Sequence, residues 1–251
     1  MRPAAPRFAV VAPMKNEADA AERLAEEIEA ACAPLGPFEA IFVDDGSDDA
    51  TAATLAALRA RKPWLRAIRH AESCGQSAAV ATGVRAAQAP LVCTIDGDGQ
   101  NPPAEIPKLV GPLLAKGRDP GLALVCGVRR ERRDVAARRL ASRAANAIRR
   151  RMLRDGSPDT GCGLKAFPRE AFLALPYFDH MHRYLPSLFL RDGWEVAHVD
   201  VDHRERTTGR TKYGNLSRAL VGALDLFGVW WLLRRRKAPR VAAAAREVEP
   251  A

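Results

Sequence analysis

Short apolar runs alternate with longer amphipathic segments along the first half of the chain. Five segments are predicted as strands: 8–12, 38–43, 65–69, 91–95 and 122–126. Four segments between them carry apolar residues at helical spacing: 20–32, 50–61, 75–87 and 106–116. Strands that alternate with helices of this length indicate right-handed βαβ units. We therefore expect an α/β fold with a mostly parallel sheet flanked by helices.

The second half of the chain has a less regular pattern. Residues 135–153 combine small apolar positions with arginines on another face, which predicts a basic amphipathic helix. Residues 195–201 are predicted as a further strand, and 216–233 as an apolar helix that is followed by four cations at 234–237. The tail at 238–251 is of low complexity, and we expect it to be disordered.

Length and cysteine content narrow the class of protein. A chain of 251 residues with 47% hydrophobic side chains fits one large domain, or one domain with a small appendage. The five cysteines form no C-x-x-C pair, which excludes a disulfide framework or a zinc ribbon and suits a reducing cytosol. The first apolar run is too brief for a signal peptide, and no stretch reaches the roughly 18 uninterrupted apolar residues of a spanning helix.

The positive charge is concentrated in one segment. Residues 127–154 contain eleven arginines and two acidic residues, so this segment carries the whole net charge of +9. Such a patch predicts an anionic partner, which is a phosphate-bearing substrate, an anionic membrane surface or a nucleic acid. The segment contains no aromatic side chain on which bases could stack, and we therefore expect no nucleic-acid partner.

Two acidic clusters follow strands of the predicted sheet. Asp96 and Asp98 come directly after the run 91–95, and Gln100 adds a carbonyl oxygen. Oxygen ligands at this spacing suit Mg²⁺ or Mn²⁺, although Asp and Gly also form ordinary solvated turns. Asp44 and Asp45 end another strand, where a carboxylate either accepts hydrogen bonds from a base or ribose or caps a helix. Ligands bind at this edge of parallel sheets.

A loop in the second half is suited to phosphate. The run from Arg206 to Lys212 places three cations and three hydroxyl groups within seven residues.

Taken in order, these features resemble the family 2 inverting glycosyltransferases of the GT-A fold, and in particular the polyprenyl-phosphate, dolichol-phosphate mannose synthase-like branch. The matching segments are 13–17 (PMKNE), 43–47 (VDDGS), 75–83 (GQSAAVATG), 96–103 (DGDGQNPP), 127–129 (GVR), 159–165 (DTGCGLK) and 206–212 (RTTGRTK). The similarity covers roughly residues 8–215. Lys15 stands where the family usually has an aromatic residue.

The resemblance implies a Rossmann-like sheet and a nucleotide-diphospho-sugar donor. The residues that it assigns to the donor are Pro13, Lys15, Glu17, Val43, Asp45, Asp96, Gly97, Asp98 and Gln100. Among these, Asp96, Asp98 and Gln100 would hold a divalent cation, Mg²⁺ or Mn²⁺, on the diphosphate.

The acceptor that the resemblance implies is a polyprenyl phosphate of the dolichyl or undecaprenyl type. Arg129, Arg206 and Lys212 would hold its phosphate and, together with Asp98, carry the catalysis. A single displacement would invert the anomeric centre and make a lipid-linked sugar for cell-envelope glycans or glycoconjugates. The alternatives are a glycosyltransferase with a soluble or polysaccharide acceptor, and a non-enzymatic binder of anionic lipid or nucleic acid.

The expected organisation follows from these assignments. Residues 1–215 form the glycosyltransferase domain, with a nucleotide-sugar half at about 7–126 and an acceptor half at about 127–215. The apolar core of the last helix, 219–233, is 15 residues or about 22 Å long, which is too short to cross a hydrocarbon core of about 30 Å. We expect 216–237 to lie in the interface of the cytoplasmic membrane face, or instead to pack on the protein itself or in a homo-oligomer.

Overall fold

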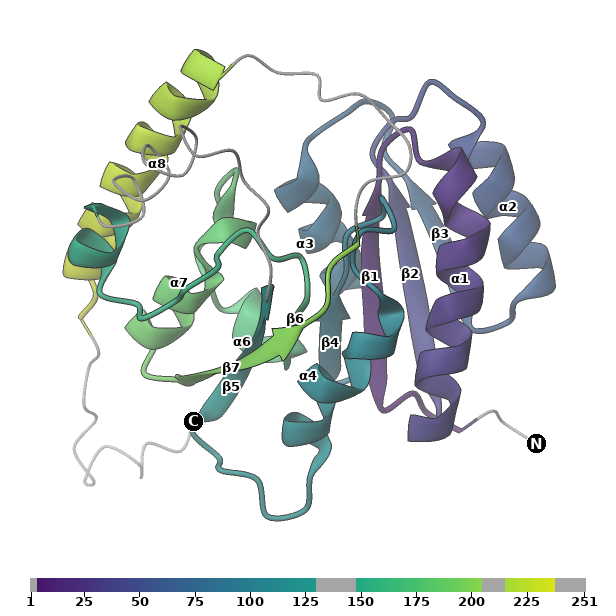
Figure 1. The fold of residues 1–251 in the computed structure, drawn as a ribbon, viewed down its shortest axis with the longest axis horizontal. Coiled ribbons are helices and arrows are strands. Elements are labelled where there is room, and N and C mark those ends of the chain that lie inside the picture. Colours follow the sequence, from purple (N-terminus) through teal and green to yellow (C-terminus); the bar gives the residue numbers. More distant parts are fainter. Residues whose placement is uncertain (1–3, 130–147, 205–214, 238–251) are drawn as a thin grey trace, which may run out of the picture.

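The computed structural model describes residues 4–129, 148–204 and 215–237 (Figure 1). The strands are β1 Phe8–Met14, β2 Phe38–Asp44, β3 Leu65–Arg69, β4 Leu91–Thr94, β5 Leu122–Arg129, β6 Lys165–Pro168 and β7 Glu195–Val201. The α-helices are α1 Ala18–Cys32, α2 Thr51–Arg61, α3 Gln76–Ala86, α4 Ile106–Leu114, α6 Arg169–Leu173, α7 Leu185–Arg191 and α8 Asn215–Arg234. Short 3₁₀ turns are η1 Ala33–Leu35, η2 Pro103–Glu105 and η3 Met181–Arg183.

The strands form one sheet in the order β3-β2-β1-β4-β6-β5-β7. Neighbouring strands are parallel except at β6, which runs antiparallel to both β4 and β5. The predicted α/β class with a mostly parallel sheet is confirmed. Because β6 is reversed, its first residue, Lys165, pairs with Thr94 at the end of β4. The carboxyl ends of β1, β2 and β4 and the start of β6 therefore lie along one edge.

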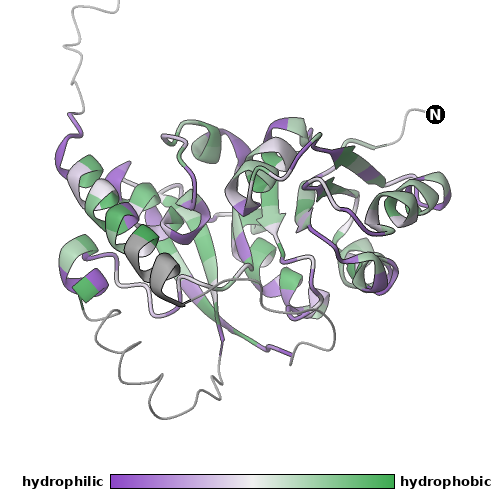
Figure 2. Ribbon diagram, turned by 90° about the horizontal axis from the view of Figure 1, so that it is seen from above, coloured by the Kyte–Doolittle hydropathy of each residue, from purple (hydrophilic) through white to green (hydrophobic). Residues whose placement is uncertain are grey.

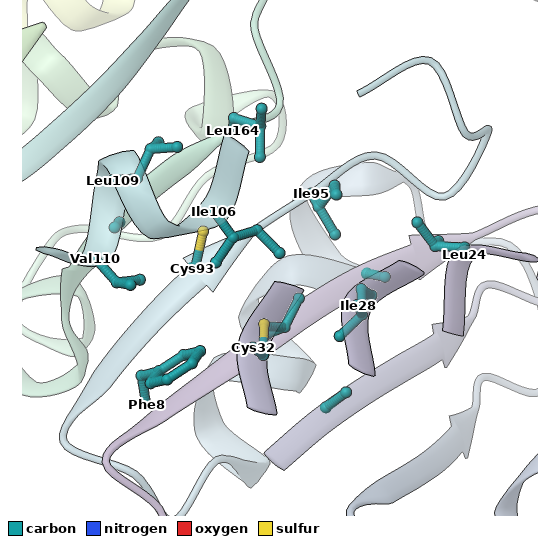
Figure 3. Close-up of a cluster of buried hydrophobic side chains, with 14 of the residues drawn as sticks. Phe8, Leu24, Ile28, Cys32, Cys93, Ile95, Ile106, Leu109, Val110 and Leu164 are labelled. Atoms are coloured by element: carbon teal, nitrogen blue, oxygen red, sulfur yellow. The ribbon is translucent and has the colours of Figure 1, made fainter. Parts of the chain in front are cut away.

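Alternating side chains of the strands build a core on each face of the sheet. On one face, Phe8 and Val10 of β1 pack with the buried residues of α1, α2 and α4. Figure 3 shows part of this cluster, with Phe8 and residues of α1 and α4 labelled. On the other face, Ala9 and Val11 pack with α3, α6, α7 and Val229 of α8. Strands that are buried on both faces need continuous apolar runs, which is the pattern that the sequence shows at β1 and, beyond Glu39, at 40–43 of β2.

The predicted elements of the first half are confirmed with small shifts at their ends. The strands at 65–69 and 195–201 have the predicted bounds, whereas β5 continues three residues beyond the predicted 122–126 to Arg129. Strand β6 and the helices α6 and α7 were not predicted from the sequence. Most of the predicted basic helix at 135–153, and the tail at 238–251, lie outside the described residues; residues 148–153 are helical.

Helix α8 packs on the protein along one side only. Val229 is buried against the core, whereas Val221, Leu224, Phe227 and Trp231 are exposed. In Figure 2 the coloured part of α8 is mostly hydrophobic or pale and becomes hydrophilic at its C-terminal end. None of the helices in the described ranges combines the length and the apolar character that a membrane crossing requires. The helix thus packs on the protein and also leaves apolar side chains uncovered.

Candidate active site

A cavity of about 720 Å³ opens at the carboxyl edge of the sheet. One side is formed by the loops after β1 and β2, a second by the loop after β4, and a third by residues 158–163 before β6 together with η3. Seven of the predicted donor residues line the cavity: Pro13, Lys15, Glu17, Asp45, Asp96, Gly97 and Asp98. The topology therefore brings both acidic clusters to one cavity, as the sequence predicts.

Three predicted residues occupy other positions. Val43 is fully buried in the core between the sheet and α3, so its side chain cannot reach a ligand in the cavity. Gln100 is not in the cavity wall; its side-chain amide donates to the backbone carbonyl of Arg204 at 3.4 Å. Arg129, at the end of β5, is likewise outside the wall. Arg206 and Lys212 lie outside the described residues.

Asp45 organises the side of the cavity next to β2. Its carboxylate accepts hydrogen bonds from Ser73 Oγ at 2.7 Å, from the Cys74 and Gly75 backbone N–H groups at 2.8 and 2.9 Å, and it lies 2.8 Å from His70 Nδ1. Burial raises the pKa of Asp45, but these hydrogen bonds outweigh burial and leave the pKa below its usual value. Asp45 is therefore a carboxylate that fixes segment 70–75 against β2.

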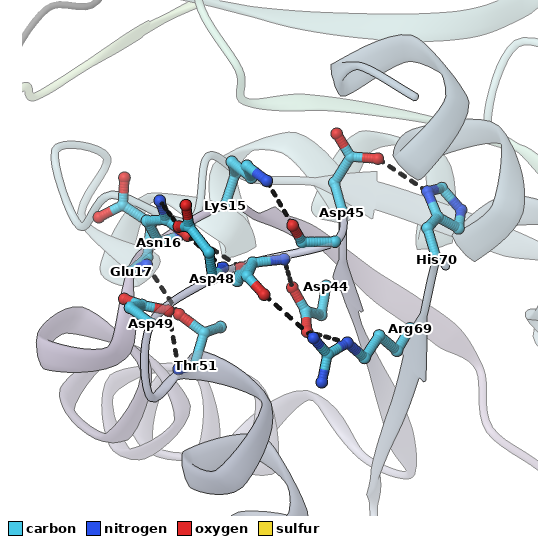
Figure 4. A network of polar contacts seen from close by, with 12 residues as sticks. Lys15, Asn16, Glu17, Asp44, Asp45, Asp48, Asp49, Thr51, Arg69 and His70 are labelled. Carbon is cyan, nitrogen blue, oxygen red and sulfur yellow. Dashed lines mark hydrogen bonds and ion pairs between the residues drawn. The ribbon is translucent and has the colours of Figure 1, made fainter. Parts of the chain in front are cut away.

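The neighbouring loops after β1 and β2 are tied to each other by polar contacts (Figure 4). Lys15 donates to the Gly46 carbonyl, and Asn16, in the left-handed region at φ 58°, bonds to Ser47 and Asp48. Asp44 accepts the Ser47 backbone N–H at 2.8 Å and is 3.3 Å from Arg69. Asp44 thus has the turn-capping role that the sequence left open, and Asp45 the role at the cavity.

Asp96 and Asp98 form the acidic wall after β4. Asp96 accepts hydrogen bonds from Gln76 Nε2 at 2.8 Å and from Asn101 Nδ2 at 2.9 Å, and Asp98 accepts the Gln100 backbone N–H at 3.1 Å. Burial, and then the charge of Asp98, raise the pKa of Asp96. Negative charge is therefore crowded here, and a bound cation would relieve the repulsion.

Two glycines allow this arrangement. A Cβ on Gly97 would lie 2.4 Å from the Pro13 carbonyl oxygen, and one on Gly163 would lie 2.3 Å from the Asp96 carboxylate. Both distances are well below a normal contact, so larger residues would displace the acidic wall.

The donor set of this wall fits a hard divalent cation. Asp96 and Asp98 supply carboxylate oxygens on one side of the cavity, and the rest of the cavity leaves space for phosphate oxygens to complete the coordination. A second group, Asp45, His70 and Cys74, also places possible ligand atoms within 4.8 Å of one another. Because the Asp45 oxygens already accept hydrogen bonds there, a cation would have to displace those donors.

Arg129 is held in an ion pair. Its Nε and Nη2 donate to the two carboxylate oxygens of Asp159 at 2.7 and 2.9 Å, and these hydrogen bonds raise the pKa of Arg129. Asp159 lines the cavity. Arg129, the predicted acceptor-binding arginine, therefore contacts the cavity wall through Asp159.

Lys165 and His182 are among the residues of the cavity wall that were not predicted as site residues. Lys165 is buried, donates to the Cys162 carbonyl, and its charge lowers the pKa of Asp96. The segment 159–165 signalled its position, but only the reversed strand β6 places it beside Asp96. His182 lies in η3, where no periodic pattern marks it.

The sequence of this chain matches a known protein family. Residues 9–175 match the family model of Glycosyl transferase family 2. The chain belongs to glycosyl transferase family 2. The predicted family is confirmed, and this family membership agrees with the observed fold.

The chain is also similar to curated proteins from bacteria. The chain is 36% identical over 209 residues to undecaprenyl-phosphate 4-deoxy-4-formamido-L-arabinose transferase from Pectobacterium carotovorum, covering 82% of this chain and 62% of that protein. It is similarly 36% identical to the Pseudomonas aeruginosa protein of that name over 206 residues, covering 81% and 59%. The chain therefore spans about three fifths of the length of these curated relatives.

Solved structures share the GT-A fold. A mannosyltransferase from Pyrobaculum calidifontis in complex with GDP-Man and Mn²⁺ superposes with a TM-score of 0.68 at 22% identity, covering 94% of this chain and 66% of that one. Glucosyl-3-phosphoglycerate synthase from Mycobacterium tuberculosis, with Mn²⁺, UDP and phosphoglyceric acid, gives 0.63 at 21% identity, covering 93% and 80%. The expected GT-A architecture is confirmed.

Proposed function

We propose that this protein is a glycosyltransferase that moves a sugar from a nucleotide-diphospho-sugar to a polyprenyl phosphate, with inversion and with Mg²⁺ or Mn²⁺. The observation that carries the proposal is one cavity whose wall contains Lys15 and Asp45 together with Asp96 and Asp98. The relatives named as undecaprenyl-phosphate sugar transferases support the lipid acceptor. The Mn²⁺ complexes among similar folds support the cation.

The donor would span the cavity from the β1 and β2 loops to the acidic wall. Asp45 fixes segment 70–75 and so shapes the nucleoside end, with Pro13, Lys15 and Glu17 beside it. Asp96 and Asp98 would hold the cation, while Gln100 reaches it only if its side chain leaves Arg204. When bound, the cation would stabilise the negative charge on the departing nucleoside diphosphate.

The acceptor phosphate needs little activation. A phosphate monoester has its second pKa near 6, so at neutral pH it is already mostly an anionic nucleophile. The protein's task is then to bring two anions together in line. Buried Lys165 supplies a fixed positive charge in the wall, and Arg206 and Lys212 would supply further cations for the acceptor.

We place the reaction at an anionic membrane surface on the cytoplasmic side. Helix α8 presents Leu224, Phe227 and Trp231, which are 72%, 59% and 49% exposed, and ends in four exposed cations at 234–237. Arg234 lies over the Trp230 ring at 4.0 Å, which places a cation next to an aromatic residue, as at membrane interfaces. Each cation near an anionic surface contributes about 1 kcal/mol.

Vesicle sedimentation tests this placement. The wild type should bind vesicles of anionic phospholipid more tightly than zwitterionic ones, and salt should weaken the binding. Leu224→Ser with Phe227→Ser should reduce the salt-resistant fraction, whereas Leu190→Ser, an exposed apolar residue on α7, is the matched control. Equal binding of wild type and double variant would contradict an interfacial α8.

The transfer itself is tested with an acceptor panel. Purified protein, Mn²⁺ and a panel of UDP- and GDP-sugars are incubated with undecaprenyl phosphate, 3-phosphoglycerate or a polysaccharide, and products are measured by mass spectrometry. The proposal expects product with the prenyl phosphate only. Transfer to a soluble acceptor with none to the lipid would favour the alternative function.

A further inference from the structure

The cavity wall contains one histidine, His182, whose polar contacts are set by its neighbours. It lies on η3, where the buried side chains of Met181 and Tyr184 fix the turn on both sides. His182 lines the main cavity, and also a recess of about 20 Å³ beside it that Asp96 and Lys165 share. The imidazole therefore lies in the same part of the cavity wall as Asp96 and Lys165.

The contact of His182 with Ser77 determines its tautomer. Ser77 is buried at the start of α3, and its Oγ lies 2.7 Å from His182 Nδ1. The same Oγ accepts the His182 backbone N–H at 3.3 Å. If Nδ1 carried the ring proton, both partners of this hydroxyl would be donors, and the buried hydroxyl proton would have no acceptor. An unmade buried hydrogen bond costs about 1–3 kcal/mol. Ser77 therefore donates to Nδ1, and the ring proton is on Nε2.

The imidazole of His182 is neutral at neutral pH. Burial, followed by the charges of Lys165, Arg183 and His180, lowers the pKa of His182 to about 3. A neutral ring with Nδ1 occupied has a single remaining polar function, which is the Nε2–H donor. Within the described part of the chain, that atom has no hydrogen-bond partner, and the side chain is partly exposed at the cavity.

The remaining groups around the recess show what this donor can bind. Asp96 is already held by Gln76 and Asn101, and Lys165 by the Cys162 carbonyl. If the diphosphate lies on Asp96 and Asp98, the sugar attached to it comes close to this recess, which Asp96 also lines. Its hydroxyl and ring oxygens are hydrogen-bond acceptors. A rigid, uncharged donor at this place would favour sugars that carry an oxygen opposite it.

We propose that His182 determines sugar specificity by donating its Nε2–H to an oxygen substituent of the transferred sugar, with Ser77 as the positioning residue that holds this tautomer. The inference rests on the proposed function, because it takes the cavity to be the donor site.

The test compares a nucleotide sugar with its free nucleoside diphosphate. The probe is whichever UDP- or GDP-sugar of the panel binds the wild type most tightly in Mn²⁺, and binding is measured by calorimetry without acceptor. His182→Ala should weaken the nucleotide sugar at least fivefold and the free nucleoside diphosphate less than twofold. His182→Gln, which keeps an N–H near the Nε2 position, should recover part of the loss. His182→Asn should not, because its amide reaches only the Nδ1 position.

Two controls separate this role from folding. His180→Asn changes a nearby histidine that bonds to Asp225 on α8 and does not line the cavity, and it should leave both affinities unchanged. In ¹⁵N-histidine spectra, Ser77→Ala should allow the His182 ring to exchange between tautomers, while the wild type shows a protonated Nε2 alone.

Different outcomes test the role of His182 and the proposed reaction. An equal loss for sugar and free nucleotide, or no loss for either, would overturn the role of His182, as would a protonated Nδ1 in the wild type. If no lipid-linked product forms but His182→Ala still weakens only the nucleotide sugar, the proposed acceptor is wrong. The role of His182 in sugar specificity would then stand.

Discussion

The substitution Gly163→Ala tests whether the position of Asp96 matters for catalysis. The new methyl group would lie 2.3 Å from the Asp96 carboxylate, about 1 Å closer than a normal contact. The backbone at Gly163 cannot easily retreat, because its carbonyl accepts a 2.7 Å hydrogen bond from Thr94 Oγ1. Asp96 must therefore move by about 1 Å and strain its bonds to Gln76 and Asn101.

Gly163→Ala is expected to lower both the stability of the fold and the rate of transfer. Disturbing two hydrogen bonds costs about 1–3 kcal/mol of unfolding free energy. A displacement of about 1 Å at a catalytic group lowers kcat/KM about 100-fold. The assay measures initial rates of sugar transfer against Mn²⁺ concentration, with urea unfolding of the same samples. Half-saturation should require more Mn²⁺ than in the wild type.

Gly228→Ala is the control, because a Cβ there meets no atom within 4 Å apart from its chain neighbours and its own helix backbone, and this exposed residue of α8 is not in the cavity wall. It should keep full activity and be slightly more stable, since alanine is the better helix former. If Gly163→Ala retained normal activity and normal Mn²⁺ dependence, the argument that Asp96 works from this position would be refuted.

Three further substitutions follow from the site. Asp98→Ala should abolish transfer with little change in stability, and EDTA should have the same effect on the wild type; activity that survives either treatment would refute the cation site. Burial raises the pKa of Asp45 but its hydrogen bonds hold it below the usual value, so its ionised form stabilises the fold above about pH 4 and this stability is lost on acidification. Asp45→Asn should consequently be less stable than wild type in urea at pH 7, with a deficit that shrinks below about pH 4. Arg129→Ala should lower the free energy of unfolding by about 3 kcal/mol, because it removes the bidentate partner of Asp159. The double variant Arg129→Ala with Asp159→Ala should recover part of that loss. Additive losses in the two single variants and the double variant would show that the pair is not coupled.

Much of the fold could be predicted because its pattern is local. Strands such as β1 are apolar runs of the right length, and helices such as α1 have apolar residues at every turn. Strand β6 could not be predicted in this way. It has four residues, LysAlaPhePro, and begins with a buried lysine whose placement depends on pairing with β4 and β5.

Part of the candidate site could also be predicted from the sequence. Asp45, Asp96 and Asp98 come directly after strands, so their convergence follows from the parallel topology. Val43 was assigned by its neighbourhood in a motif, although alternation along the strand turns its side chain into the core. His182 and Lys165 come from segments more than 60 residues away from Asp96, and only the three-dimensional structure brings them to the cavity.

The most direct measurement of the central claim is the chemical identity of the product. Wild-type protein, Mn²⁺, undecaprenyl phosphate and the best-bound nucleotide sugar are incubated, and the lipid fraction is examined by mass spectrometry and by NMR of the anomeric centre, with Asp98→Ala in parallel. The account predicts a prenyl-phosphate sugar with inverted anomeric configuration, formed together with an equal amount of nucleoside diphosphate and absent from the variant. A lipid fraction without sugar, or a product with retained configuration, would contradict it.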